Sequence, residues 1–568
     1  MSRAETLEFL RSQPEISVLI IGGGINGIGT FRDLSLQGVD VLLVEKGDFG
    51  SGASAASSHM LHGGIRYLEN GEFRLVREAL TERNLMLQNA PHFAKPLPTT
   101  IPIFKWFSGL FNAPLKFLNL RDKPGERGAV VIKLGLILYD IFARSYRVMP
   151  THRLNMREKS LQLYPNINPD IVCTANYYDA WMPCPERICL EQIMDGEVLN
   201  PQARALNYCA AVAGQGDTVT LRDEVTGERY TVKPRLVINA AGPWIDFMNT
   251  ALGQQTRMIG GTKGSHIIVD SAELHRATND NEIFFENNDG RIVVILPFMG
   301  KVMIGTTDIR IDDPEQAVCT DDEIDYMVNL VSKVFPAIKV ERSQIVFKFC
   351  GVRPLPGSDK NYTGNISRDH SIQTLEPQVS GLKYPVYVLV GGKWTTFRAF
   401  AEQTTDRVLT FLGARRKAST MNLAIGGGQH YPKTEAAKQA WSASVASETK
   451  LSVERVQTLL ERYGTRAEQI ASFISADMDT PLKTVPDYST REIVFIAEQE
   501  RVLHLEDVVL RRTLLAWLGQ LTTEMLVEIT AIIAPSLGWS PERRQQEIER
   551  AIQLLRTKHG LDLAVMAG

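Results

Sequence analysis

One stretch near the start of the chain constrains its fold more than any other: "ISVLIIGGGINGIGTFRDLSLQGVDVLLVEKGD", residues 16–48. Val18 to Ile21 are apolar and mostly β-branched, which predicts a buried strand. Ile25 to Gln37 has the periodicity of a helix, and Val39 to Val44 is a second apolar run. Strand, glycine turn, helix and strand in this order predict a βαβ unit, and therefore a parallel sheet in an α/β protein.

Three glycines follow the first predicted strand directly, in the spacing GxGxxG: Gly22, Gly24 and Gly27. The first suits a tight turn, the second lets the backbone approach a pyrophosphate, and the third permits close packing of the helix on the sheet. Glu45 stands at the end of the second strand, where a carboxylate accepts a hydrogen bond from a ribose hydroxyl. A lone GxGxxG can be a structural turn, but in this context it predicts dinucleotide binding.

Three later stretches extend this pattern. "RLVINAAGPW", Arg235 to Trp244, predicts a strand that ends in small residues beside a cofactor. "RIVVILPF" and "KVMIGTTD", separated by Met299-Gly300, predict an antiparallel hairpin. "PVYVLVGGKWTTFRAFAEQTTDRVL", residues 385–409, is again strand, glycine pair and helix. The nucleotide-binding elements are therefore dispersed along the chain, with a sheet-containing insertion between them.

The segment after the βαβ unit favours FAD over NAD. A nicotinamide dehydrogenase usually continues with further alternating strands and helices, whereas here the small, serine-rich "GDFGSGASAASSHMLHGG" follows, residues 47–64. Such a segment can run along the pyrophosphate and ribityl chain of an extended flavin and donate hydroxyl and backbone hydrogen bonds. The alternative is a surface loop.

Length and composition limit the number of domains and the possible partners of the protein. A chain of 568 residues is too long for one core and predicts two or three domains. The net charge of −3 gives no basic field, so we expect no nucleic-acid partner. The six cysteines lack metal or disulfide spacing, so we expect free thiols and no metal. We see no secretory signal and no apolar run that spans a bilayer, which predicts a protein kept inside the cell.

From Arg416 onward amphipathic helices dominate, which predicts a separate helical domain over residues 420–568.

Eight strings in order carry a resemblance: "IGGGINGIG", "SSHMLHGGIRYLE", "NAAGPW", "KGSHIIV", "GTTD", "GVRPL", "GGKWTTFR" and "LEDVVLRRT". Together they resemble the FAD-dependent glycerol-3-phosphate dehydrogenases, the respiratory, aerobic-type enzymes that pass electrons to quinone. The resemblance implies a Rossmann-like FAD domain, of the glutathione-reductase and amino-acid-oxidase kind, with an inserted antiparallel-sheet substrate domain and a C-terminal α-helical domain. We place the FAD domain at 15–98, about 165–260 and 346–412, and the substrate domain at about 99–164 and 261–345.

The resemblance also implies site residues. Those expected to bind FAD are Gly22, Gly23, Gly24, Ile25, Asn26, Gly27, Glu45, Ser57, Ser58, Leu61, His62, Gly63, Gly64, Ala240, Gly242, Gly391, Gly392, Thr395 and Thr396. Those expected to bind the substrate are Arg66, Tyr67, Thr307, Asp308, Arg353 and Lys393. Arg66, Arg353 and Lys393 are candidates for a phosphate clamp. His266, Arg353 and Lys393 are the candidate catalytic residues, with His266 the first choice of base. Ala53 and His59 depart from the family pattern, in which a hydroxyl residue and a lysine are frequent.

The implied reaction oxidises sn-glycerol 3-phosphate to dihydroxyacetone phosphate, with hydride transfer from C2 to flavin N5 and onward transfer of electrons to a membrane quinone. Three alternatives stay open: an oxidase that uses O₂ and releases hydrogen peroxide, a relative that oxidises amines or hydroxy acids, and a flavin-binding module without turnover. A homodimer is possible.

Two segments bear on membrane contact. "IPIFKWFSGLFNAPLKFLNLRDK", from Ile101, mixes aromatic and basic residues as a surface in the lipid headgroup region does. "AVVIKLGLILYDIFARSYR", from Ala129, has a similar composition, but for it we favour core packing. We expect a cytoplasmic protein that docks peripherally on the inner face of the cell membrane through the first segment.

Overall fold

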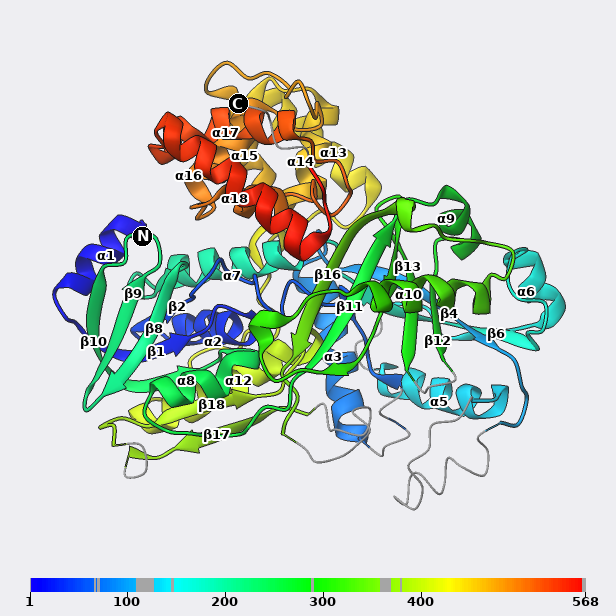
Figure 1. The fold of residues 1–568 in the computed structure, drawn as a ribbon, viewed down its shortest axis with the longest axis horizontal. Helices are drawn as coiled ribbons and strands as arrows, with labels where there is room; N and C mark the ends of the chain where they lie inside the picture. The colour runs from blue at the N-terminus through cyan, green and yellow to red at the C-terminus, as the bar shows by residue number, and fades with distance from the viewer. Residues whose placement is uncertain are drawn as a thin grey trace.

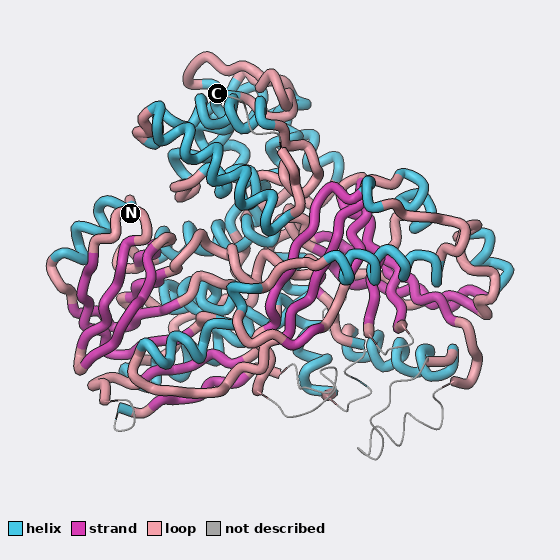
Figure 2. Tube along the Cα trace, viewed as in Figure 1, coloured by secondary structure: helices cyan, strands magenta, loops and turns pink. Residues whose placement is uncertain are grey.

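The computed structural model describes residues 2–65, 68, 72–108, 127–144, 148–287, 291–357, 369–377 and 381–563. Two sheets lie side by side, with helices around them and a helical C-terminal part above (Figure 1; Figure 2). The α/β class and the helical C-terminal domain are thereby confirmed.

The first sheet carries the nucleotide-binding motif. Its strands in order are β17 (Ser371–Leu375), β18 (Val386–Val390), β10 (Arg229–Asn239), β1 (Glu15–Ile21), β2 (Val41–Val44) and β7 (Arg204–Leu206), with β8 (Cys209–Gln215) and β9 (Thr218–Asp223) joined to β10. Strand β1 pairs in parallel with β2 and with β10, so the predicted βαβ unit is confirmed. The strand predicted before "AAGPW" and the strand before Gly391 also lie in this sheet, one beside the other.

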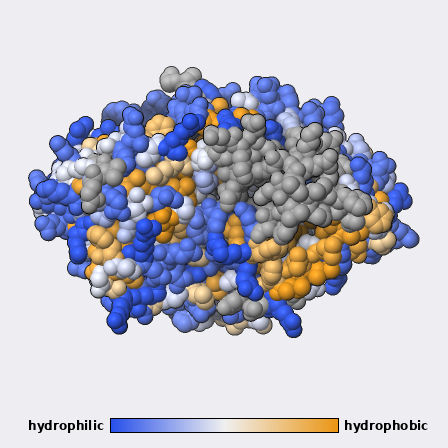
Figure 3. All heavy atoms as spheres, turned by 90° about the horizontal axis from the view of Figure 1, so that it is seen from below, coloured by the Kyte–Doolittle hydropathy of each residue, from blue (hydrophilic) through white to orange (hydrophobic). Residues whose placement is uncertain are grey.

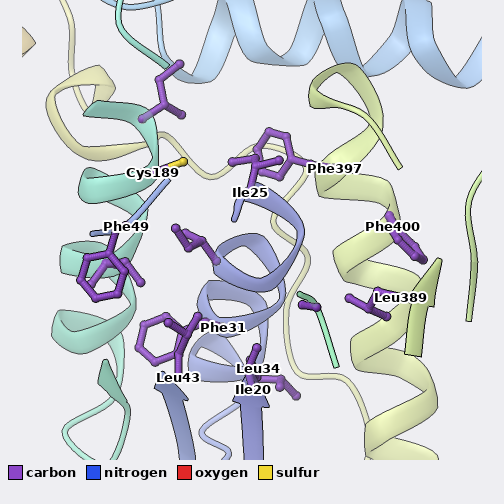
Figure 4. Packing of buried hydrophobic residues seen from close by; sticks show 14 of the residues in the cluster. Ile20, Ile25, Phe31, Leu34, Leu43, Phe49, Cys189, Leu389, Phe397 and Phe400 are labelled. Carbon is purple, nitrogen blue, oxygen red and sulfur yellow. The ribbon is translucent and has the colours of Figure 1, made fainter. Parts of the chain in front are cut away.

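Helix α2 (Ile25–Leu36) covers one face of this sheet, between α7 (Pro185–Leu199) and α12 (Phe397–Leu412). Figure 4 shows Phe31 near Leu43 of β2, Phe397 near Ile25 at the start of α2, and Phe400 near Leu389 of β18. Phe31 and Phe400 are fully buried, and a buried side chain of this size contributes about 1.5–3 kcal/mol. A Cβ atom on Gly27 would lie 2.1 Å from the carbonyl oxygen of Gly22, so the third glycine of the motif allows this close packing.

The second sheet is built mainly from strands of the predicted insertion. Its strands in order are β15 (Ile309–Arg310), β11 (Thr262–Val269), β14 (Lys301–Gly305), β13 (Ile292–Phe298), β12 (Glu282–Glu286), β4 (Lys95–Ile103), β6 (Cys173–Trp181) and β3 (Met60–Leu61); β16 (Ile345–Arg353) pairs with β11, and β5 (Arg153–Met156) with β6. The hairpin of β13 and β14 is confirmed, and its turn residues Met299 and Gly300 both have positive φ, as a two-residue hairpin loop requires.

Three strands lie elsewhere than the sequence predicted. We placed β3, β6 and most of β16 in the FAD-binding parts, but all three belong to the second sheet. There β6 pairs with β3 and with β4, and β16 pairs with β11. The physical reason is that a strand pairs with the neighbour whose register buries the apolar faces of both. That neighbour can be far away in sequence, so a local pattern does not identify it.

Further helices flank the sheets: α1 (Arg3–Arg11), α3 (Phe73–Asn89), α5 (Ala129–Phe142), α6 (Arg157–Leu163), α8 (Ile245–Ala251), α9 (Ala272–Thr278) and α10 (Asp321–Val334). The C-terminal helices are α13 (Glu435–Thr449), α14 (Val453–Tyr463), α15 (Ala467–Ser475), α16 (Thr490–Gln499), α17 (Thr523–Leu537) and α18 (Pro541–His559). The later ones, from α16 to α18, share a core with the second sheet, in which Trp517 packs against Phe347 and Phe349 at ring distances of 4.7 and 4.9 Å.

His559, at the end of α18, joins this core and predicts a pH dependence. Its ring stacks on Phe347, its Nδ1 lies 3.1 Å from the carbonyl oxygen of Lys348, and burial lowers its pKa from 6.5 to about 4. A half-buried histidine whose pKa is lowered in this way contributes stability that is complete above pH 6.5 and is lost as the pH falls toward 4. Between pH 7.5 and 5 this loss is about 2 kcal/mol. We therefore expect the thermal midpoint of His559→Gln to fall less over this range than that of the parent; an equal fall would contradict the assignment.

Candidate active site

A cavity of about 1060 Å³ is lined by both sheets and by the serine-rich segment. Many predicted site residues line it: Gly22, Gly24, Ile25, Asn26, Glu45, Ser57, Ser58, His62, Gly64, Ala240, Gly242, His266, Thr307, Asp308, Arg353, Gly391, Gly392, Lys393 and Thr395. Gly23, Gly27, Leu61, Gly63 and Thr396 lie outside its lining. Arg66 and Tyr67 lie outside the described residues. The structure thus gathers residues separated by more than 300 positions around one cavity.

The glycine motif forms one end of the cavity. Gly22 has a φ of +112°, and a Cβ there would lie 2.6 Å from the carbonyl oxygen of Ala240 on the neighbouring strand, so only glycine fits. Gly24 is the N-cap of α2 and lines the cavity, and a Cβ there would meet only Ser54 Oγ, at 3.3 Å. The positive end of α2 therefore faces the cavity, as in sites that bind a pyrophosphate.

Glu45 lies beside this helix end. Its carboxylate accepts hydrogen bonds from Gly23 N at 2.7 Å and from Gly47 N at 2.8 Å. Burial raises the pKa of Glu45, and these two backbone donors oppose the rise. The two backbone bonds fix the orientation of the carboxylate at the cavity wall, which suits an acceptor for a ribose hydroxyl.

These features fit FAD. The volume exceeds the 300–1,000 Å³ typical of small-molecule pockets. Gly24 leaves a cradle that a larger side chain would fill, and Asn26 Oδ1 is buried with no hydrogen-bond partner among the described residues. Ser51, Ser54, Ser57 and Ser58 follow the cavity wall from the nucleotide end, as predicted for the serine-rich segment.

Gly63 requires a correction. We expected it to let the chain pack against the flavin, but a Cβ there would meet Leu80 of α3 and Tyr139 of α5, both at 2.4 Å. Its N–H donates to Asp179 Oδ1 at 3.0 Å. Gly63 therefore allows helix packing behind the cavity wall, whereas its neighbour Gly64, with a φ of +73°, lines the cavity itself.

His266, on β11, also lines the cavity. Its ring stacks on Phe349 at 4.8 Å with an interplanar angle of 3°, and its Nε2 lies 2.8 Å from Ser58 Oγ. Its Nδ1 is buried and has no hydrogen-bond partner among the described residues. Burial, together with the positive charge of Arg353 and the nearby His59, holds the pKa of His266 well below 6.5. The imidazole is therefore neutral at pH 7 and able to accept a proton.

Arg353 lies beside His266, at the end of β16. Its guanidinium lies over Gly264, where a Cβ would approach within 2.2 Å, so this glycine makes room for the arginine. It donates to Thr306 Oγ1 at 2.9 Å and to Asp308 Oδ1 at 3.3 Å. Lys393 lines the same cavity from the segment after β18. Arg353 and the neutral imidazole of His266 are therefore neighbours in a cavity that Lys393 also lines, and the two cations are suited to a small anionic substrate.

Some residues that line the cavity were not predicted from the sequence. Asp179 lines the cavity, is buried, and accepts hydrogen bonds from Arg83 Nη1 at 3.0 Å and from the hydroxyl of Tyr139. Burial raises the pKa of Asp179. A lone carboxylate in the apolar strand "CTANYYDAW" was the available clue. Ser54 was also missed; its Oγ accepts from Ile25 N at 2.9 Å and caps α2.

The chain matches known proteins along most of its length. Residues 17–407 match the family described as FAD dependent oxidoreductase, and residues 418–544 match the C-terminal domain of alpha-glycerophosphate oxidase. A glycerol-3-phosphate dehydrogenase of Synechocystis sp. is 33% identical over 578 residues, which cover 95% of this chain and 97% of that protein. The mitochondrial glycerol-3-phosphate dehydrogenase of Mus musculus is 28% identical over 597 residues, 98% of this chain and 76% of that protein.

Solved structures agree on the fold. The glycerol-3-phosphate dehydrogenase from Bacillus halodurans, complexed with FAD, superimposes with a TM-score of 0.75 at 21% identity and covers 100% of this chain and 99% of that one. The L-alpha-glycerophosphate oxidase from Mycoplasma pneumoniae, with FAD bound, has a TM-score of 0.50 at 20% identity over 69% of this chain and 94% of that one.

Proposed function

Because the chain belongs to the FAD-dependent glycerol-3-phosphate dehydrogenase family, we propose that it oxidises sn-glycerol 3-phosphate to dihydroxyacetone phosphate. The observation that supports this substrate most directly is that Arg353 lies beside neutral His266 in a cavity that Lys393, the glycine motif and Glu45 also line. Bound FAD supplies the acceptor for the hydride that leaves C2.

The two cations have distinct tasks in this proposal. A phosphate monoester is a dianion near neutral pH, and a guanidinium offers it paired donors while an ammonium adds a point charge. Arg353 already uses Thr306 and Asp308 to fix its plane, so less conformational freedom is lost when it meets the substrate. Asp308 also keeps this charge balanced before the substrate arrives.

His266 is the proposed proton acceptor. The C2 hydroxyl must lose its proton as the hydride leaves, and a neutral imidazole at the cavity wall takes it. Ser58 and Phe349 hold the ring in one orientation, and Arg353 beside it stabilises negative charge that develops on the C2 oxygen.

The test is anaerobic reduction of the purified, FAD-loaded protein. Glycerol 3-phosphate should bleach the flavin absorbance near 450 nm within a stopped-flow experiment, whereas glycerol, which lacks the phosphate, and small amino acids should not. Bleaching by an amino acid instead would indicate an amine oxidase, and no bleaching by any of them would indicate a flavin-binding module without turnover.

We propose a membrane quinone as the electron acceptor, with O₂ as the alternative. Helix α5 supports this because it links the surface to the cavity wall: the hydroxyl of Tyr139 lies 3.1 Å from the backbone nitrogen of Gly63, next to the cavity-lining Gly64. Its other side is apolar and exposed, at Leu134, Ile137, Leu138 and Ile141. Quinone reduction measured beside peroxide release distinguishes the two acceptors.

The face of α5 changes our expectation about membrane contact. Core packing holds only for one side of this helix, with Leu136 and Tyr139 buried, while Leu134 and Ile141 are 58% and 57% exposed. In the first segment, Trp106 and Phe107 are exposed and the stretch 109–126 lies outside the described residues. Figure 3 shows a broad apolar area on this side of the molecule. Among the helices of the described ranges, none has the length and apolarity needed to cross a bilayer.

We propose that the α5 face docks on the anionic inner face of the cell membrane, and a charge-insertion variant tests this. Leu134→Glu/Leu138→Glu/Ile141→Glu should lose co-sedimentation with vesicles that contain anionic lipid, because each glutamate opposes insertion and adds repulsion. It should keep turnover with a water-soluble electron acceptor. Its matched control is Val198→Glu/Val225→Glu/Met478→Glu, which changes three exposed apolar residues elsewhere on the surface. Vesicle binding by the α5 variant at the parent's level would show that this face is not the docking surface.

A further inference from the structure

The turn that follows Glu45 is tied to the C-terminal helical domain. Asp48, in this turn, is 1% exposed and lies 464 positions from Arg512. Its carboxylate accepts from Arg512 Nη1 at 2.6 Å and Nη2 at 3.0 Å, and from Arg511 Nε at 2.6 Å. Asn207 Nδ2 donates to it at 3.0 Å. Both arginines belong to "LEDVVLRRT", a family string to which the proposed function gives no role.

A second set of contacts holds the same turn. Arg511 and Arg512 end a π-helix (Asp507–Arg512), an irregular element that is frequent at functional sites. Asp507, at its start, accepts from the hydroxyl of Tyr208 at 2.6 Å and pairs with Arg511. The backbone nitrogen of Tyr208 in turn donates to the carbonyl oxygen of Gly47 at 2.8 Å. The turn is therefore held through a side chain and through its backbone by the same π-helix.

The burial of both charged groups indicates that the contact between Asp48 and Arg512 has one fixed geometry. The side chains of Asp48 and Arg512 are 0% and 1% exposed. Burial by itself would raise the pKa of Asp48, but the two guanidinium groups hold it well below its usual range. A buried pair of this kind is weak evidence for net stability, since desolvation offsets much of its attraction, but it does specify one geometry.

That geometry is transmitted to Glu45 over a short distance. Gly47 N donates to Glu45 Oε1, and Cys209 N donates to the carbonyl oxygen of Glu45 at 2.7 Å. Asp48 follows Gly47 directly, so a shift of Asp48 moves the donor that orients the Glu45 carboxylate. Each link from Arg512 to the cavity wall is thus a hydrogen bond or a peptide bond.

We propose that Arg511 and Arg512 are positioning residues through which the C-terminal domain holds Glu45 in the orientation that binds the ribose of FAD. The proposal rests on the assignment of FAD and is independent of the identity of the substrate. It gives the helical domain a role in cofactor affinity.

The test is the dissociation constant for FAD, measured by flavin fluorescence quenching on deflavinated full-length protein. Arg512→Ala and the nearly isosteric Asp48→Asn should each raise it about 10- to 100-fold, as expected when hydrogen bonds that orient a ligand-binding residue are lost. Arg512→Lys, which keeps the charge, should restore part of the affinity. At saturating FAD the KM for glycerol 3-phosphate should stay within about twofold, since the substrate end is not contacted.

Glu492→Gln is the matched control. Glu492, on α16, is a buried carboxylate of the same domain. It pairs with Arg455 and Arg462 of α14 and, within the described part of the chain, makes no hydrogen bond or ion pair with the turn after Glu45. The substitution should lower the thermal midpoint and leave the FAD dissociation constant unchanged. An unchanged constant in both Arg512→Ala and Asp48→Asn, or an equal rise in the control, would overturn the proposal. A parent apoprotein that binds no FAD would instead refute the cofactor assignment.

Discussion

Gly24→Val should fold yet be purified with less than about a tenth of the parent's flavin. A Cβ on Gly24 meets only Ser54 Oγ, at 3.3 Å, and a shift of this side chain by a few tenths of an ångström relieves the contact. The added side chain points into the cavity at the N-terminus of α2, where the backbone must approach the pyrophosphate of FAD. Absorbance measures the flavin content, and circular dichroism with a thermal scan shows whether the variant is folded.

Gly27→Val provides the comparison for this first variant. A Cβ on Gly27 would lie 2.1 Å from the carbonyl oxygen of Gly22, so this substitution should destabilise the fold itself. We expect the position-24 variant to lose flavin and keep its fold, and the position-27 variant to lose its fold. This difference would separate cofactor binding by Gly24 from the packing role of Gly27. Normal flavin content in Gly24→Val would show that this glycine does not face the pyrophosphate.

Arg353→Ala and Lys393→Ala should retain FAD and lose at least ~10²-fold in kcat/KM, on the order of 3 kcal/mol, through the loss of a charge-assisted contact to phosphate or alkoxide. Arg353→Lys should recover little, because a single ammonium cannot reproduce the paired donors of the guanidinium. Steady-state kinetics with glycerol 3-phosphate at saturating FAD give these numbers.

Two further variants sharpen this experiment. His266→Asn should lower kcat with a smaller change in KM, because it removes the proton acceptor and leaves the cations in place. Arg310→Ala is the matched control: Arg310 also lines the cavity but was not assigned to the clamp. Unchanged kinetics in both Arg353→Ala and Lys393→Ala, or an equal loss in the control, would contradict the proposed clamp.

The parts of the fold that were predictable are those in which a local pattern and the tertiary structure agree. The βαβ unit was readable because Val18 to Ile21 must pair in parallel with a strand reached through a helix, and the glycines between them leave few alternatives. The hairpin at Met299-Gly300 was readable for the same reason, since its turn residues and its two apolar runs are adjacent.

The remaining features depend on partners far away in sequence. Nothing local in "CTANYYDAW" indicates that β6 pairs with β4, and Asp179 gains its role only when Arg83 and Tyr139 are brought to it. The exposed face of α5 was missed because an apolar helix has the same composition whether it is buried on one side or on all sides. Gly63 and Gly64 were both expected to pack against the flavin. Only the backbone conformation shows that a Cβ on Gly63 would point toward α3 and α5 instead of into the cavity.

The long separation between Asp48 and Arg512 has a consequence for how the protein is made. A ribosome synthesises the glycine motif and Glu45 first, and the arginines that neutralise Asp48 emerge 464 residues later. During that interval the carboxylate lacks its two guanidinium partners, and burying it alone would be unfavourable. If Arg511 and Arg512 position Glu45 as we propose, the nascent chain should bind FAD tightly only after translation has passed the π-helix.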